Sequence, residues 1–363
     1  MKTLAVIPSE PIAEYLDAGY GADWLMDYYN PSHYFDKVYL LSPLEEDESD
    51  FLGMEVIKTL DKELPKRLKE LNVDVVRAYG GYWACDMACN YKVKGIPVVV
   101  SVHDINPNLL HDSIKKADIV LCVSSIVKEK VLEKFPNESH VWILPNRVNF
   151  KTMHPYTPEE CEDLMMQFPF THKILHVGRK TKQKNLDTLI KALKILGDEY
   201  CLISSGKGDV EEYHKLADEQ DVRERCLFFE AIPQEELARY YSFADCMCTP
   251  SRWEGFGMVF TEALACGAVV ITSDIAPMND FITHNENGLL IEDYENPQKL
   301  AEVIKHACTD DGIRKILKTN ARNSVTKFSK ERIDTMEAGY YRQIEVMKKN
   351  KEFDHVWYKK LFG

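Results

Sequence analysis

Two glutamates separated by seven residues stand in the stretch SRWEGFGMVFTEALACG, which runs from Ser251 to Gly267. Glu254 precedes a Gly-Phe-Gly turn, and Glu262 lies in an apolar run that predicts a helix with Gly267 as its left-handed C-terminal cap. We expect Glu262 to point away from the apolar stripe of this helix. The glycines allow a ligand to approach the backbone, and the N–H groups at the helix N-terminus suit an anion. Either glutamate alone is better explained as a solvated residue, but the whole constellation predicts a binding site.

A second loop carries positive charge. It follows the predicted strand KILHVG and precedes an amphipathic helix headed by Asn185. Between Gly178 and that helix lie four cations: Arg179, Lys180, Lys182 and Lys184. The planar guanidinium of Arg179 and the ammonium of Lys184 are suited to neutralising a diphosphate without a metal ion, and a solvated basic loop is the alternative. A third loop after a predicted strand, SSGKGDVEEY, contributes Gly206.

Short β-rich runs alternate with helical patterns along nearly the whole chain, which is typical of parallel α/β architecture. The predicted strands are LAVIP, KVYLLS, VDVVRAYG, PVVVSVHD, DIVLCVS and VWILPN, followed by KILHVG, YCLISSG, CLFFEA, CMCTPS, AVVITSD and GLLIED. We predict two Rossmann-like doubly wound parallel sheets: an N-terminal domain at residues 1–150, a linker at 151–172, a C-terminal domain at 173–328, and C-terminal helices at 329–363 that return to the first domain. Because ligands bind beyond the carboxyl ends of the strands in such sheets, the loops described above should face an interdomain cleft.

The composition excludes several classes of protein. The chain has 363 residues, 45% of them hydrophobic, and a net charge of −13, whereas a nucleic-acid-binding surface needs a basic footprint. It has neither an apolar run long enough to cross a bilayer nor a signal peptide, so we expect a cytoplasmic protein. The ten cysteines are scattered through apolar segments and are interpreted as buried thiols. We expect no metal and no cofactor, since no Cys/His spacing or acidic cluster suggests a site.

The glutamate pair and the cationic loop together resemble a retaining glycosyltransferase of the GT-B fold, similar to glycosyltransferase family 4. The motif of two glutamates matches Glu254 and Glu262, and the donor loop of that family matches Gly178, Arg179 and Lys184. The resemblance covers Lys173 to about Tyr341. It implies that Glu262 binds the ribose of a nucleotide-sugar donor and that Arg179 and Lys184 stabilise the diphosphate leaving group. It further places Glu254 and the backbone of Gly255, Phe256 and Gly257 at the sugar hydroxyls, and the amides of Met258 and Val259 near the phosphates.

The first half of the chain resembles the family less closely. The segment SVHDINP is similar to the His-bearing strand end of the family, which implies that His103 contacts the donor sugar near the reacting carbon, with Asp104 beside it. Tyr82 and Trp83, in YGGYWACD after a predicted strand, have the shape to stack on a flat acceptor, and aromatic packing at the domain edge is equally compatible. These three residues, Tyr82, Trp83 and Asp104, are the acceptor-side candidates.

The expected function is the transfer of a hexose-type sugar from a nucleoside diphosphate, UDP by first choice, to an acceptor hydroxyl with retention of configuration and without a metal. The acceptor is a lipid-linked glycan, a small metabolite or a polymer end. A nucleotide-sugar epimerase or hydrolase of the same fold, and a non-catalytic scaffold, are the alternatives. The tail MKKNKEFDHVWYKKLFG combines lysines with aromatic residues, which suits peripheral contact with an anionic membrane, although packing on the N-terminal domain is the favoured interpretation.

Overall fold

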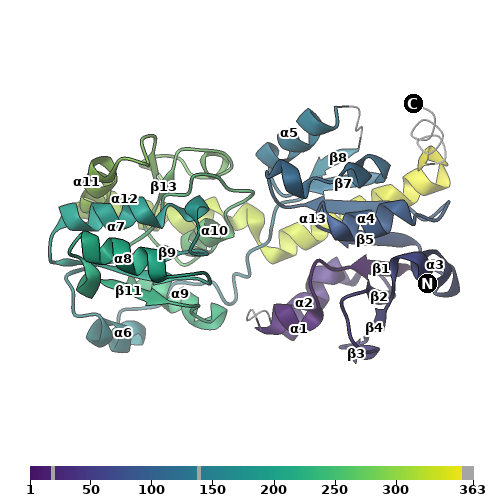
Figure 1. Cartoon of the computed structure of the whole chain (residues 1–363), viewed down its shortest axis with the longest axis horizontal. Coiled ribbons are helices and arrows are strands. Elements are labelled where there is room, and N and C mark those ends of the chain that lie inside the picture. Colours follow the sequence, from purple (N-terminus) through teal and green to yellow (C-terminus); the bar gives the residue numbers. More distant parts are fainter. Residues whose placement is uncertain (18–20, 137–139, 354–363) are drawn as a thin grey trace. The chain divides into compact units, whose positions relative to one another are not determined.

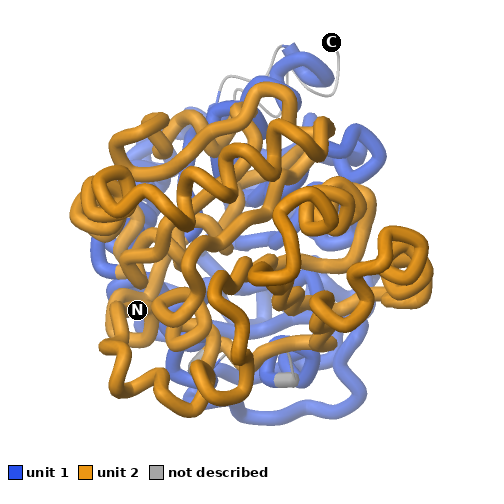
Figure 2. The backbone as a smooth tube through the Cα atoms, turned by 90° about the vertical axis from the view of Figure 1, so that its left-hand side faces the viewer, with its two compact units in different colours: residues 1–146, 331–363 blue, residues 147–330 orange. Residues whose placement is uncertain are grey.

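The computed structural model describes residues 1–17, 21–136 and 140–353. The chain divides into two compact units (Figure 2): unit 1 comprises residues 1–146 and 331–363, and unit 2 comprises residues 147–330. The predicted tail residues Trp357, Tyr358, Lys359, Lys360, Leu361 and Phe362 lie outside the described residues. In the described part of the chain, no helix combines the length and the apolar character needed to span a membrane.

Unit 1 is built on an eight-stranded sheet with the strand order β3-β4-β2-β1-β5-β6-β7-β8. All neighbouring pairs are parallel except β3 and β4. Its strands are β1 Thr3–Ile7, β2 Lys37–Ser42, β3 Ser49–Phe51, β4 Met54–Lys58, β5 Val75–Tyr79, β6 Val98–Val102, β7 Ile119–Cys122 and β8 Val141–Ile143. Its α-helices (Figure 1) are α1 Ile12–Asp17, α2 Ala22–Tyr29, α3 Leu64–Glu70, α4 Trp83–Asn90, α5 Ser125–Lys134 and α13 Lys330–Lys349.

Unit 2 has a six-stranded, wholly parallel sheet with the order β11-β10-β9-β12-β13-β14. Its strands are β9 His172–Val177, β10 Tyr200–Ser205, β11 Cys226–Phe229, β12 Cys246–Thr249, β13 Val270–Ser273 and β14 Leu289–Ile291. Its α-helices are α6 Glu162–Gln167, α7 Leu186–Leu196, α8 Glu211–Glu219, α9 Gln234–Phe243, α10 Met258–Ala265, α11 Pro297–Thr309 and α12 Asp311–Ser324. The apolar faces of α7 and α11 pack with the sheet in one buried core, so the loops at the strand ends rest on a rigid support.

All twelve predicted strands are present, and the two parallel sheets agree with the predicted fold class. The antiparallel hairpin of β3 and β4 was missed because an acidic run, EEDESD, leads into it and β3 has only three residues. Its turn uses positive φ angles at Leu52 and Gly53, 52° and 83°. Residues 151–172, expected to be a linker, carry α6 and belong to unit 2.

The last helix, α13, packs within unit 1 for nearly all of its length. Its buried residues Ile333, Tyr341 and Ile344 join the core of the eight-stranded sheet. Glu337 forms a buried ion pair with Arg77 of β5 at 3.4 Å. Removal of one partner from a buried ion pair strongly destabilises a protein, because the other charge is left buried without compensation. This pair therefore fixes where α13 lies on the sheet of unit 1. The ten cysteines are all buried and free, as predicted.

Candidate donor site

The loops after the neighbouring strands β9 and β12 form the centre of the candidate site in unit 2. The strands are parallel and paired at Cys246 and Ile174, so their carboxyl ends lie at the same edge of the sheet. The backbone N–H of Arg252 donates to the carbonyl of Gln183 at 2.8 Å, and the Gln183 side-chain amide donates to the carbonyl of Trp253 at 2.8 Å. The cationic loop and the Gly-Phe-Gly loop are therefore joined by two hydrogen bonds.

Lys184 and Glu254 are in direct contact across these two loops. The ammonium of Lys184 lies 2.5 Å from Oε1 of Glu254, and the side chains are only 10% and 6% exposed. The hydroxyl of Ser251 donates to the same oxygen at 2.7 Å. Within the described residues, Oε2 of Glu254 has one weak contact, with the amide of Gln183 at 3.5 Å. Glu254 is thus held through one carboxylate oxygen, while the other retains capacity to accept a hydrogen bond.

Glycines allow the loop after β10 to pack closely against the cationic loop. A Cβ atom at Gly206 would collide with the carbonyl oxygen of Gly178, so a side chain is excluded at this position. A Cβ at Gly178 would lie 3.0 Å from the stem of Lys184. Gly178 and Gly206 therefore have a steric role, which is to let the post-strand loops pack together and to accommodate the stem of Lys184.

The four cations of the predicted loop have different environments. Arg179 is exposed, and its side chain makes no hydrogen bond or ion pair within the described part of the chain. Lys180, by contrast, is buried and donates to the carbonyl oxygens of Gly206 and Phe229, the latter at 2.6 Å. Burial lowers the pKa of Lys180 to about 8. Lys180 thus serves to attach two loops to each other, which leaves Arg179, Lys182 and Lys184 as cations for a ligand.

Helix α10 begins at the predicted place but is not amphipathic. Gly257 precedes it with φ 84°, and Gly267 follows it with φ 72°, which is the left-handed geometry predicted for the C-terminal cap. Every residue from Phe260 to Ala265 is buried. The expectation that Glu262 points away from the core is wrong, because Glu262 is only 7% exposed and its carboxyl group interacts with Gln234 and Tyr241 of α9. Burial raises the pKa of Glu262 to about 7.

Two supporting residues carried no signal in the sequence. His176 of β9 is fully buried and contacts the hydroxyl of Ser204 through Nδ1 at 3.1 Å. Burial, followed by the charges of Lys184 and Lys180, lowers the pKa of His176 to about 3, so its ring stays neutral beside these cations.

Arg252, the second supporting residue without a signal in the sequence, holds the cationic loop through hydrogen bonds. It donates two hydrogen bonds to Asp187, at 3.1 and 3.0 Å, one to Glu295 at 2.6 Å and one to the carbonyl of Lys182 at 2.6 Å. Asn185 does head α7, but its side chain accepts from Thr188 rather than from the helix backbone, so it is not a conventional cap.

The predicted residues of unit 1 follow β5 and β6. Nε2 of His103 lies 3.0 Å from the hydroxyl of Ser101, and burial, with the charge of Arg77, lowers the pKa of His103 to about 4. Asp104 accepts from the backbone of Asn106 at 2.7 Å. Tyr82 and Trp83 are half-buried, so part of each ring remains open to solvent.

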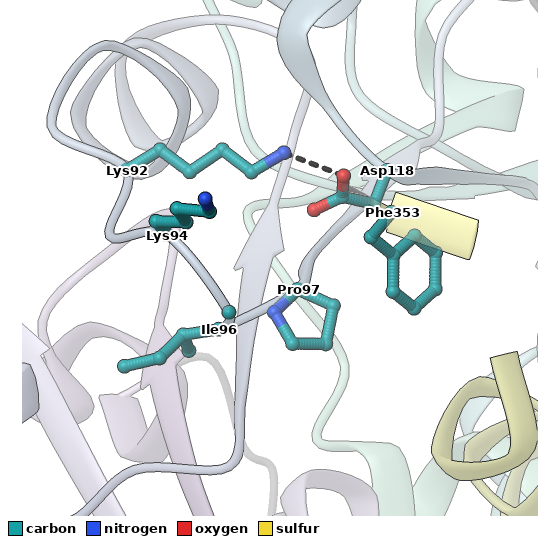
Figure 3. Close-up of a pocket in the computed structure, with 7 residues that line it drawn as sticks. Lys92, Lys94, Ile96, Pro97, Asp118 and Phe353 are labelled. Carbon is teal, nitrogen blue, oxygen red and sulfur yellow. Dashed lines mark hydrogen bonds and ion pairs between the residues drawn. The ribbon is translucent and has the colours of Figure 1, made fainter. Parts of the chain in front are cut away.

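Two cavities of unit 1 lie away from these strand ends. One, of about 20 Å³, is lined by Lys92, Pro97, Asp118 and Phe353, and the ion pair of Lys92 with Asp118 at 2.5 Å closes one side (Figure 3). It is too small for a sugar. The other, of about 340 Å³, has its Lys2 and Lys348 already paired with acidic side chains. Among the described residues, no group of three or more His, Cys, Asp or Glu side chains is arranged to hold a metal ion.

Comparison with known structures identifies the fold. The chain is similar in structure to a sucrose-phosphate synthase from Thermosynechococcus elongatus, with a TM-score of 0.77, 19% identity and coverage of 95% of this chain and 100% of that one. It is also similar to HepE of Anabaena, solved with UDP and glucose, with a TM-score of 0.78, 17% identity and coverage of 94% and 100%. These similarities establish the GT-B fold.

Residues 171–324 match the family of glycosyl transferases group 1. Over 173 residues the chain is 32% identical to an uncharacterized glycosyltransferase of Methanocaldococcus jannaschii, which covers 47% of this chain and 44% of that protein. Over 202 residues it is 31% identical to a D-inositol 3-phosphate glycosyltransferase of Xylanimonas cellulosilytica, with coverage of 52% and 48%. The chain thus spans about half the length of these relatives. The predicted resemblance to a GT-B glycosyltransferase is confirmed: residues 171–324, within unit 2, match the group 1 glycosyltransferase family, and the chain has the GT-B fold.

Proposed function

We propose that the chain transfers a hexose-type sugar from a nucleoside diphosphate to an acceptor hydroxyl, with retention of configuration and without a metal ion. The observation that carries this proposal is a group of three residues beyond the carboxyl ends of β9 and β12, in which Lys184 and Ser251 both donate to Oε1 of Glu254. It lies within the residues that match the group 1 family. In this proposal the cation of Lys184 lies beside the carboxylate that binds the sugar, so that it can act on the charged leaving group.

The cations act on the leaving group. When the bond between the anomeric carbon and the diphosphate oxygen breaks, the diphosphate takes the electron pair and gains negative charge. Lys184 has three N–H donors and directs one to Glu254, so the others are available to a diphosphate. The exposed guanidinium of Arg179 supplies a second cation with fork geometry. Donors fixed by packing before the reaction stabilise the developing charge more than mobile water does.

The two glutamates bind the neutral parts of the donor in this proposal. Oε2 of Glu254 accepts from a sugar hydroxyl, and Glu262 accepts from the ribose. His103, kept neutral, contacts the transferred sugar. UDP is the first choice of nucleotide, which is supported by the binding of UDP and glucose to HepE of Anabaena, a protein of the same fold.

Thermal stabilisation by nucleotides tests the donor site. UDP, GDP, ADP, CDP and dTDP are each added to the purified chain, to Glu262→Ala and to Glu219→Ala, a control on the exposed face of α8. We expect one nucleotide to stabilise the chain and the control, and to lose its effect in Glu262→Ala. Sugar conjugates of that nucleotide are then tested for transfer. Absence of any nucleotide-dependent shift would contradict the proposal.

A further inference from the structure

Three loops of unit 1 meet beyond the carboxyl ends of the adjacent strands β1, β5 and β6. The indole N–H of Trp83 donates to the carbonyl of Ser9, after β1, at 3.2 Å. The backbone N–H of His111, in the loop after β6, donates to the carbonyl of Gly81, after β5, at 2.8 Å. These hydrogen bonds join the three loops into one surface, which we call the acceptor rim and define by Ser9, Tyr82, Trp83, Asp86, Asp104 and His111.

The rim contains a hydrogen-bonded group that the sequence did not reveal. Nδ1 of His111 lies 2.7 Å from Oδ2 of Asp86, in the first turn of α4, and Ser113 donates to Oδ1 of Asp86 at 2.6 Å. A carboxylate only accepts, so Nδ1 of the histidine carries the hydrogen and Nε2 keeps its lone pair when the ring is neutral. The side chain of His111 is 41% exposed, and Nε2 has no hydrogen bond within the described residues. Nε2 of His111 is therefore an oriented, solvent-accessible acceptor.

The charges around the rim favour an uncharged ligand. Glu10, Asp86, Asp104 and Asp112 lie on or next to the three loops. Lys134 approaches the loop after β6, but its ammonium donates to the carbonyls of Pro107 and Leu110, at 3.1 and 2.5 Å. Lys115 lies 3.5 Å from Asp112. A phosphorylated ligand favours free cations, and the described side chains of these loops offer it a surplus of carboxylates instead.

We propose that the acceptor rim receives an uncharged sugar or glycan end, with one hydroxyl donating to Nε2 of His111 and the apolar face of the ring lying on Tyr82. The ring of Tyr82 packs over Gly80 and is half-buried, which holds it in a fixed position. A flat aromatic face with one oriented polar group is a common arrangement in carbohydrate-sized sites. This inference rests on the proposed sugar transfer and adds to it the class of the acceptor.

The test separates acceptor binding from donor binding. Methyl hexosides and the corresponding hexose 6-phosphates are used as probes in ligand-observed NMR with the full chain, and as acceptors in transfer assays. His111→Asn keeps a donor for Asp86 but lacks Nε2. The control is His33→Asn, because His33 also pairs with an aspartate of unit 1, Asp27, at 3.4 Å.

We expect methyl hexosides, and not the phosphates, to bind and to accept sugar. His111→Asn should raise the acceptor KM about 5- to 10-fold, as expected for one lost hydrogen bond, and leave the donor KM and the melting temperature unchanged. Preference for the phosphates, or an acceptor KM equal in His111→Asn and the control, would overturn the inference while sugar transfer stands. Absence of both nucleotide binding and transfer would overturn the proposed function and this inference together.

Discussion

The buried carboxyl group of Glu262 makes stability depend on pH in a way that can be calculated. Its pKa rises from an ordinary value of 4.5 to about 7 because the folded chain removes it from water. Below pH 4.5 the group is protonated in both the folded and the unfolded chain and has no effect. Above pH 7 the folded chain must hold a buried anion. The free energy of unfolding therefore falls by about 3 kcal/mol as the pH rises from 4.5 to 7.

The substitution Glu262→Gln isolates this contribution. Glutamine has the shape of the protonated acid and does not titrate, so every other titration cancels when the two proteins are compared at the same pH. We expect the wild-type chain to lose about 3 kcal/mol relative to the variant from pH 4.5 to 8. For a domain of the size of unit 2, this loss corresponds to a relative decrease in melting temperature of roughly 10 °C.

Differential scanning calorimetry at half-unit pH intervals measures this difference. Glu219→Gln, on the exposed face of α8, serves as the control and should give a nearly constant difference. If the difference between wild type and Glu262→Gln is also constant from pH 4.5 to 8, Glu262 titrates at its ordinary pKa, and the reasoning from burial is refuted.

Three other predictions concern the same unit. Arg179→Ala should reduce kcat at least 100-fold, more than it raises the donor KM, because its charge acts on the leaving group; equal effects on both constants would contradict this role. Gly206→Ala should lower the melting temperature by more than 5 °C, whereas Gly53→Ala, also at positive φ but with open space around it, should cost much less; similar losses would exclude the collision with Gly178 as the cause. Sugar transfer should persist in an excess of EDTA, and loss of activity that returns on addition of Mg²⁺ or Mn²⁺ would contradict metal independence.

The sequence predicted the strands better than the surroundings of the site residues. Buried parallel strands are runs of apolar residues, so the strands of both parallel sheets could be predicted from the sequence. The position of Glu254 after β12 follows from strand order, but its contact with Lys184 joins residues 70 positions apart, and no local pattern encodes such a pairing. Lys180 and Lys184 are residues of the same type in one loop, yet Lys180 donates to backbone carbonyls and Lys184 pairs with a carboxylate.

Helical periodicity also failed at Glu262 for a physical reason. The pattern assumes that a helix has one buried face, whereas α10 packs against α9, α12 and β13, and all its residues from Phe260 to Ala265 are buried. A polar residue in such a helix has no solvent-facing position. Its burial is therefore set by tertiary packing, which the periodicity of eight residues does not record.

The two glutamates, equivalent in the motif, differ in what compensates their charge. One oxygen of Glu254 binds a cation and a hydroxyl. Glu262 forms no ion pair within the described residues, and burial disfavours its charged form. If Glu262 binds ribose as a carboxylate, nucleotide binding must also deprotonate it, so affinity should increase about fivefold from pH 6 to 7 and about twofold more before it levels off near pH 8. Surroundings that separate two carboxyl groups in this way commonly assign them different tasks. If the proposed site is correct, Glu254 is suited to hold the sugar through Oε2, and Glu262 is suited to couple nucleotide binding to loss of a proton.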